Sequence, residues 1–222
     1  MIFKISIIFI VAINCISNFA QDSIQVTFVP SWEDCPIALN AEYETNEDVI
    51  IEISQLKFYL SNFRTSLNIK SNNYHLLDLT DTASFSFKIH SENSNHLYFN
   101  LGVDSNTNMQ GAQGGDLDPT NGMYWTWQSG YINVKLEGYY SKQFTGAEEF
   151  TFHLGGYSGI KNACQPIQLP IDLKQKEIFI KINLADFFNQ VNVVEQNMIM
   201  SPSIKAVEMS KKMAEIFSVG RK

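Results

Sequence analysis

Apolar and polar residues alternate in short stretches along most of the chain. The stretch Ile178–Leu184 shows this most clearly, because an apolar residue recurs there at every second position. A period of two is typical of strands with one face on a core and the other in water, as in antiparallel sheets. The apolar positions of these stretches are Ile24, Val26, Phe28; Leu56, Phe58, Leu60; Phe85, Phe87, Ile89; Leu97, Phe99, Leu101; Ile132, Val134, Leu136; Phe150, Phe152, Leu154; and Ile178, Ile180, Ile182, Leu184.

Several such stretches separated by polar turns predict a mainly β fold, an antiparallel β-sandwich or a barrel-like domain. The C-terminal segment has a different period. Ser201 and Pro202 suit the N-cap and first position of a helix, and the apolar residues that follow recur at helical spacing. We therefore predict a C-terminal amphipathic helix at about 202–218, docked on the sandwich. The apolar positions of this helix are Ala206, Met209, Met213, Ile216 and Phe217. Residues 21–222 contain no repeat or linker and are predicted to form a single domain.

One connection breaks the alternation. Residues 102–123 are rich in Gly, Asn, Asp and Pro, which favour turns. A loop of this length inside a compact domain is usually functional or disordered. It leads directly into the most aromatic segment of the chain, Met123–Tyr131, so we predict a functional loop held by aromatic side chains.

The N-terminus has the pattern of a signal peptide. Lys4 precedes the apolar run Ile5–Ile13, and Ala20 is a small residue at a suitable cleavage point. A run of about nine apolar residues is too short to cross a bilayer, which takes about 20. We predict that residues 1–20 are a signal peptide and that the protein is exported to the periplasm or the extracellular space. Cys15 leaves a lipidated N-terminus as an alternative, although Asn14 is a poor residue before a lipidated cysteine.

Composition and charge narrow the function classes. The apolar fraction of 45% suffices for a core. The formal net charge of −7 argues against nucleic-acid binding, because phosphates require a basic surface. No later segment resembles a membrane span. After removal of residues 1–20 the cysteines are Cys35 and Cys164, and an even pair in an oxidising compartment predicts a disulfide between them.

The common enzyme signatures are missing from the sequence. It contains no Cys-x-x-Cys, no His-x-x-x-His and no phosphate-binding glycine loop before a helix. Asp116 and Asp118 are close enough to act as a general acid and base, but they lie in a turn-rich loop, where Asp commonly forms turns. We therefore expect a binding protein rather than an enzyme, and a hydrolase using Asp116 or Asp118 is the less favoured reading.

Oxygen ligands recur in the loop in a way that resembles a calcium site. Asp104, Asn106, Asp116 and Asp118 offer carboxylate and amide oxygens, which Ca²⁺ prefers. The EF-hand pattern does not fit, because Met109 and Gly115 occupy its Gly and Glu positions. A calcium site of another type is an alternative function.

Trp125 and Trp127 lie two residues apart, so on a strand both indoles would project to the same face. Such a pair is common in a core or in a surface on which a ligand stacks.

Four segments together resemble the MbnP-like domain family, which is named for a methanobactin-associated periplasmic copper-binding protein. They are Leu101–Asp104, Gly115–Pro119, Gly122–Tyr131 and Lys135–Gly138. Further similarity comes from Leu56–Asn62, Phe152–Gly156 and Met200–Pro202, so that the resemblance spans most of the chain after residue 20.

The resemblance implies an exported β-sandwich-like protein with a di-haem cytochrome c peroxidase-like partner, MbnH. In the family the partner oxidises a Trp of the Met-aromatic-Trp motif to kynurenine, whose aniline nitrogen then joins histidines in binding copper. The matching residue here is Trp125, with Trp127 as the second choice. His153 matches a family position and is the histidine expected to contribute to a copper site.

The sequence also departs from the family pattern. Copper-binding members carry His shortly after the Tyr of the early strand, where this chain has Ser61. A second His is expected after the Gly-Val turn, but Asp104–Asn108 contains none. A copper site of the family type would therefore lack imidazole ligands. For His75 and His153 a structural role is the favoured reading, because a single His on an apolar strand is more often a structural residue than a ligand.

Overall fold

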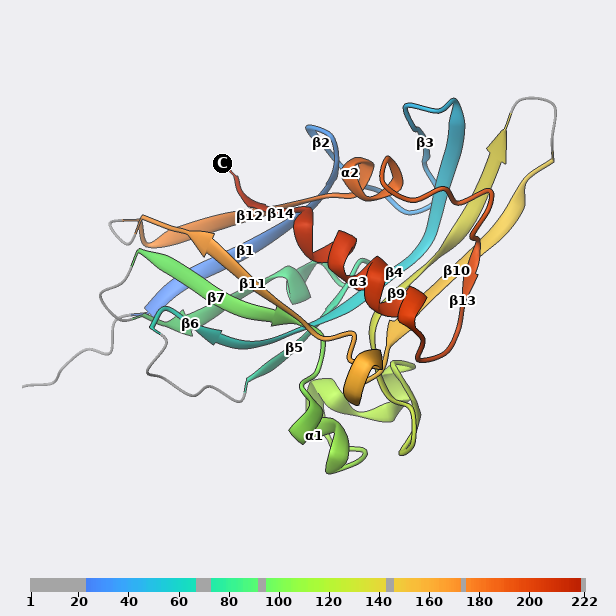
Figure 1. Ribbon diagram of the computed structural model, residues 1–222. Helices are drawn as coiled ribbons and strands as arrows, with labels where there is room; N and C mark the ends of the chain where they lie inside the picture. The colour runs from blue at the N-terminus through green and yellow to red at the C-terminus, as the bar shows by residue number, and fades with distance from the viewer. Residues whose placement is uncertain (1–22, 67–72, 92–94, 143–145, 173–174, 221–222) are drawn as a thin grey trace, which may run out of the picture.

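The computed structural model describes residues 23–66, 73–91, 95–142, 146–172 and 175–220. Two curled β-sheets face one another, and a long helix lies across one side of them (Figure 1). The predicted signal peptide at residues 1–20 lies outside the described residues.

The smaller sheet is built around β1 (Ser23–Trp32). Its strand order is β14-β12-β1-β2, and β6 also pairs with β1. The other strands are β2 (Cys35–Pro36), β6 (Ser86–His90), β12 (Glu177–Asn183) and β14 (Phe217–Val219). β1 and β12 run parallel, with Val26 opposite Ile178.

The larger sheet is built around β4 (Val49–Arg64), with the order β11-β7-β4-β9-β10-β13. β3 and β5 also pair with β4, and β8 pairs with β9. The other strands are β3 (Glu42–Glu44), β5 (Tyr74–Asp78), β7 (His96–Leu101), β8 (Tyr124–Thr126), β9 (Gly130–Lys142), β10 (Glu148–Gly155), β11 (Gln165–Pro170) and β13 (Met198–Ile199).

The predicted alternation holds along these strands, and the mainly β, sandwich-like fold is confirmed. The inner faces of the two sheets meet in one core, in which the ring of Phe28 lies within about 6 Å of the rings of Phe63 and Phe99. Two apolar positions fall outside strands but remain buried: Phe85 ends the 3₁₀ turn η1 (Thr82–Phe85), and Leu184 begins α2 (Leu184–Phe188).

The sheets are mixed rather than purely antiparallel. β1 pairs with β12 and β10 pairs with β13 in parallel, while the remaining pairs are antiparallel. Alternation reports which face a residue takes but not the direction of the neighbouring strand, so this feature could not be read from the pattern.

The C-terminal helix is confirmed, but it begins later and ends earlier than predicted. α3 spans Ile204–Glu215, because Ser203 rather than Ser201 is the N-cap and its Oγ accepts a 3.1 Å hydrogen bond from the Ala206 amide. Phe217 continues into β14 rather than the helix. The expected apolar positions are all buried, and α3 lies against β10 and β11 (Figure 1).

Candidate functional site

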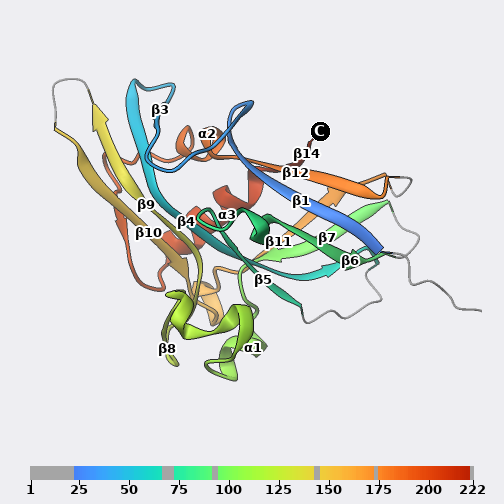
Figure 2. The same ribbon diagram turned by 180° about the vertical axis from the view of Figure 1, so that it is seen from behind.

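The long loop between β7 and β8 is a folded unit at one end of the larger sheet. It forms the short helix α1 (Ser105–Met109) and the 3₁₀ turns η2 (Gly115–Leu117) and η3 (Pro119–Asn121). It projects from the body at the bottom of Figures 1 and 2. A small second core lies beneath it, formed by Tyr59, Val103, Leu117, Met123, Tyr131 and Ile132. Aromatic side chains therefore hold the loop, as predicted, and its functional role stays a prediction.

Asn108 links this loop to the hairpin of β8 and β9, which carries Trp125 and Tyr131. It is 2% exposed, and its Nδ2 donates to the carbonyls of Val103 and Asp104 at 2.9 and 3.0 Å. Its Oδ1 accepts a 2.8 Å hydrogen bond from the Tyr131 amide. Gly130 has a φ of +74°, and a Cβ there would collide with Asn108 Oδ1, so the hairpin approaches Asn108 closely only because residue 130 is Gly.

Two buried tyrosines hold the loop from below. Tyr59 Oη donates to the Asp116 carbonyl at 2.9 Å, and Tyr131 Oη donates to the Leu117 carbonyl at 3.0 Å. Burial raises the pKa of both phenols, so both remain protonated donors. Tyr131 and Asn133 alternate with the inward-facing Ile132 and Val134, yet both are at most 1% exposed, because the loop covers this face of β9.

Asp104 caps α1. Its Oδ1 accepts from the Thr107 amide at 3.1 Å and its Oδ2 from Tyr74 Oη at 2.6 Å. Burial alone would raise the pKa of Asp104, but the hydrogen bonds from Tyr74 and Thr107 outweigh it and hold the pKa below its usual value. The Asp104 carboxylate thus serves as the N-cap of α1 and as the acceptor for Tyr74.

The other residues of the predicted calcium site also serve local turns. Asp116 Oδ2 accepts from the Leu76 amide at 3.1 Å, Asp118 Oδ1 accepts from the amide and hydroxyl of Thr120, and Asn106 is exposed on α1. Across the described residues, no three His, Cys, Asp or Glu side chains gather in a way that could hold a metal ion. The structure therefore gives the calcium prediction no shared cluster, and it separates Asp116 and Asp118 into different hydrogen-bond networks.

The two tryptophans do not form the same-face pair that their spacing predicted. β8 ends at Thr126, and its register with β9 shifts between Tyr124 and Thr126. Trp127 therefore falls in the turn, where it is 70% exposed. Trp125 is half-buried and packs against the small second core.

The indole of Trp125 lies directly over the backbone of β10. A Cβ added at Gly155 would lie 2.7 Å from Trp125 Cζ3, so the ring occupies the space that a side chain would take. Phe152 and Leu154 point into the core, so His153 faces the opposite way, and the register of β10 with β9 shifts between Leu154 and Gly155. Trp125 thus lies over the end of β10, two residues along the chain from His153.

His153 forms an ion-pair-like contact with a carboxylate. It is 8% exposed, and its Nε2 lies 2.6 Å from Glu137 Oε1. Lys135 also approaches the same carboxylate oxygen, at 3.6 Å. Glu137 and Lys135 are on β9, and Lys135 is directly opposite His153 in the ladder.

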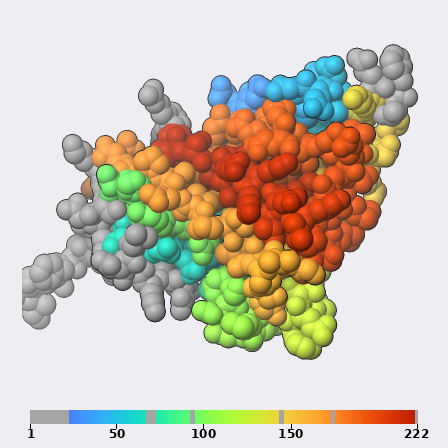
Figure 3. Space-filling view, in the orientation of Figure 1, coloured from blue at the N-terminus to red at the C-terminus, as the bar shows by residue number. Residues whose placement is uncertain are grey.

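The hairpin, the loop and the turn after β10 are cross-linked. Tyr157 Oη donates to the Trp127 carbonyl at 3.2 Å, and Ser105 Oγ donates to the Tyr157 carbonyl at 2.5 Å. In the space-filling view, the segment around η4 (Gly159–Lys161) sits against the projecting loop (Figure 3). These contacts make the projecting end one connected unit.

The family model of MbnP matches residues 21–202. The chain belongs to the MbnP family. The expected family membership is thereby confirmed, and the match includes the hairpin, His153 and the segment up to Pro202. No curated protein sequence matches the chain.

A solved structure has the MbnP fold as well. MbnP from Methylosinus trichosporium superposes with a TM-score of 0.59 at 12% sequence identity, covering 89% of this chain and 98% of that one. At 12% identity this structural similarity shows that the two chains share a fold, and it does not show that they bind the same ligands.

The residues of this MbnP-family chain do not fit a copper site made of several imidazoles. Ser61 is fully buried, and its Oγ donates to the Gly102 carbonyl at 2.7 Å. Its hydroxyl is therefore engaged in a backbone hydrogen bond inside the fold. His75 stacks on the ring of Phe87 with centroids 3.6 Å apart. Burial is the main cause that lowers the pKa of His75, which keeps this imidazole neutral. His153, whose Nε2 lies 2.6 Å from Glu137, is the remaining histidine among the predicted copper ligands.

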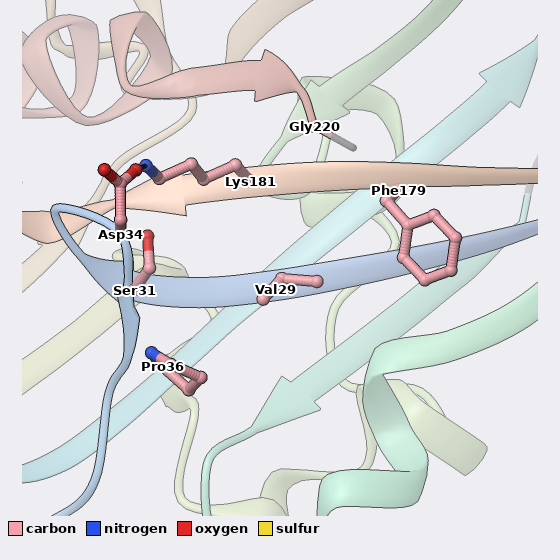
Figure 4. A pocket seen from close by; sticks show the side chains of 7 residues that line it. All are labelled: Val29, Ser31, Asp34, Pro36, Phe179, Lys181 and Gly220. Atoms are coloured by element: carbon pink, nitrogen blue, oxygen red, sulfur yellow. Dashed lines mark hydrogen bonds and ion pairs between the residues drawn. The ribbon is translucent and has the colours of Figure 1, made fainter. Parts of the chain in front are cut away.

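Two surface hollows contribute little chemistry. One of about 430 Å³ lies beside the loop and is lined by His75, Asp116, Gln110 and Gln113 among others. The other, of about 290 Å³, lies on the smaller sheet, where Lys181 Nζ is paired with Asp34 at 2.7 Å (Figure 4). That ion pair lowers the pKa of the Asp34 carboxyl. Lys181 and Asp34 neutralise one another, so neither offers this hollow an unpaired charge for a ligand.

The predicted disulfide between Cys35 and Cys164 is wrong, because both thiols are free. Cys35 is in β2 on the smaller sheet, whereas Cys164 directly precedes β11 on the larger sheet. β2 and the η4 turn before Cys164 lie at opposite ends of the molecule (Figure 1). Cysteine count alone carries no information on this separation.

Replacing Gly155 by Ala should displace the Trp125 indole. The new Cβ would lie 2.7 Å from Trp125 Cζ3 and 2.6 Å from the Tyr131 carbonyl, so we expect a loss of about 1–3 kcal/mol in unfolding free energy. The measurement is urea unfolding followed by tryptophan fluorescence, with a red-shifted native spectrum expected. Gly114→Ala is the matched control, since nothing lies within 4 Å of its Cβ. Equal stability of the two variants would contradict the packing of Trp125 on β10.

The two cysteines should differ in reactivity. Burial, followed by the nearby Asp104 carboxylate, raises the pKa of the Cys164 thiol to about 12, whereas Cys35 is exposed. At pH 8.5 iodoacetamide should alkylate Cys35 and spare Cys164, as read by mass spectrometry. Because the folded pKa is raised, the stability contributed by the Cys164 thiol is fully present below the ordinary thiol pKa and is lost as pH rises toward 12. Resistance of both cysteines until a reductant is added would show a disulfide instead.

Proposed function

We propose that this MbnP-family chain is an exported binding protein whose functional element is the hairpin that carries Trp125. In this proposal a di-haem peroxidase-like partner of the MbnH type oxidises Trp125 to kynurenine. The observation that carries the proposal is the position of Trp125, whose half-buried indole is held on Gly155 at the end of β10 and packs against the small second core. Contacts through Asn108 and Tyr157 hold the hairpin in place.

Trp125 is preferred over Trp127 for two reasons. It occupies the motif position that the family resemblance assigns to the oxidised residue, and its ring is held against the backbone of β10 at Gly155. Trp127 is in the turn and 70% exposed, so a product formed there would have no neighbouring ligand fixed by a strand. Its exposure instead suits contact with a protein partner.

Export to the periplasm or the extracellular space is part of the proposal. Its support is the predicted signal peptide at residues 1–20 together with the family membership. No helix in the described part of the chain is long and apolar enough to cross a membrane.

Copper as the ligand is a prediction from the family resemblance. A multi-imidazole site is not supported here, because Ser61 and Asp104–Asn108 replace the expected histidines and are engaged in packing and capping. The alternative, a module that binds calcium through Asp104, Asn106, Asp116 and Asp118, has weaker support, since the three carboxylates each cap or brace a local turn. A hydrolase based on Asp116 and Asp118 meets the same objection.

Peptide mapping across Met123–Tyr131 tests the proposed modification. Protein from the native host should carry the mass of kynurenine at Trp125, and protein from a heterologous host without the haem partner should carry intact Trp. Trp127→Phe expressed in the native host should still be modified, whereas Trp125→Phe should not.

Copper titration with metal analysis on the same two samples separates the ligand from the modification. Native protein that has intact Trp125 and Trp127 would contradict the proposed oxidation, whatever its copper content. Modified protein without bound copper would uphold the oxidation and remove copper as the ligand.

A further inference from the structure

Asn121 and Gly122 form the one Asn-Gly pair of the sequence, and they lie where the 3₁₀ turn η3 ends in the projecting loop. An Asn-Gly pair is the backbone sequence most prone to deamidation, because glycine has no side chain to hinder the attack of its own nitrogen on the asparagine side chain. Gly122 is exposed, and nothing lies within 4 Å of a Cβ added there. Water therefore has access to this peptide bond.

The folded loop holds both groups that would have to react. Asn121 is half-buried, and its Nδ2 donates to the carbonyls of Asp116 at 3.0 Å and Gly115 at 3.4 Å. The Gly122 N–H donates to the Pro119 carbonyl at 3.0 Å. The Gly122 nitrogen attacks only after it loses its proton and reaches the Asn121 side chain, so these hydrogen bonds must open first.

The Asn121 amide also holds the loop together. The Asp116 carbonyl accepts from Asn121 and, at 2.9 Å, from Tyr59 Oη, so this oxygen joins η2 and η3 to the small second core. Lys57 Nζ lies 3.5 Å from the Asn121 carbonyl oxygen, and its charge is paired with Asp78 at 2.8 Å. The amide of residue 121 is thus a donor that this part of the loop needs.

We propose that Asn121 is a deamidation site that the folded loop protects, and that deamidation keeps the loop open once it has opened. In the reaction the Gly122 nitrogen forms a bond to Asn121 Cγ, the bond from Cγ to Nδ2 breaks, and ammonia leaves. Water then opens the resulting succinimide ring to aspartate or isoaspartate. The net reaction consumes one water and releases one ammonia, without any change of oxidation state.

The product cannot restore the original contacts. A carboxylate only accepts hydrogen bonds, so at residue 121 it would face the carbonyls of Gly115 and Asp116 without a donor. Residues 102–131 already carry three Asp and no Lys, Arg or His, so the new charge also adds to an acidic loop. From the lost hydrogen bonds we expect the modified loop to open at least about tenfold more often.

The site therefore records how long the loop has been open. Asn108 joins the loop to the hairpin that carries Trp125, so a ligand or a partner that holds the hairpin closed would slow the reaction in proportion to the closed population. The proposal goes beyond the proposed function and does not rest on it, because it requires neither a metal nor oxidation of Trp125.

Peptide mapping of the aged full-length protein tests the protection. The wild type is incubated at mildly alkaline pH, either folded or unfolded in guanidinium chloride, and the products at residue 121 are identified by mass spectrometry and by enzymatic methylation of isoaspartate. We expect deamidation of Asn121 to be at least about tenfold slower in the folded protein. Asn106, which is exposed on α1 and is followed by Thr107, is the internal control and should react far more slowly than Asn121 in the unfolded chain. Equal rates in the two states, or no product at residue 121 in the unfolded chain, would overturn the proposal.

Hydrogen–deuterium exchange of Asn121→Asp tests the effect of the product on the loop. Amides of residues 115–123 should exchange at least about tenfold faster than in the wild type, while β4 stays protected. Asn106→Asp is the matched control, because it adds the same charge to the same loop at an exposed position, and it should leave the exchange of residues 115–123 unchanged. Wild-type exchange in Asn121→Asp, or equal acceleration in both variants, would contradict the role of the Asn121 amide.

Discussion

The hydrogen bonds of Asn108 are the interaction on which the functional end of this protein depends. One buried amide joins the start of the long loop, through Val103 and Asp104, to the Tyr131 amide at the base of the tryptophan hairpin. A buried amide group that loses its partners costs about 1–3 kcal/mol, so each part of this arrangement holds the other in place. The absence of a side chain at Gly130 is what allows the approach.

This constraint separates the molecule into a scaffold and a working end. The scaffold is the aromatic core between the two sheets, and the working end is the loop and hairpin folded over the outer face of β9. Trp125 lies over Gly155 at the end of β10, where the working end meets the scaffold. The hairpin that carries this indole is locked onto a strand, and such rigid placement favours binding.

The sequence allowed the inward faces of the strands, the terminal helix and the family to be predicted, because period two, period 3.6 and the aromatic motif are local signals. It did not reveal the parallel pairs, the burial of Tyr131 and Asn133, or the separation of Cys35 from Cys164, because these depend on which distant segments meet. Trp127 was misplaced because β8 ends one residue before it.

The central claim is that the loop and the hairpin form one ordered unit held to the sheet by Asn108. Hydrogen–deuterium exchange of Asn108→Ala against the wild type tests it most directly. The account predicts that amide protection is lost together across residues 103–131 while β4 and β10 stay protected, because the core between the sheets does not depend on this side chain. Protection that is unchanged across residues 103–131, or lost equally throughout the larger sheet, would contradict the claim.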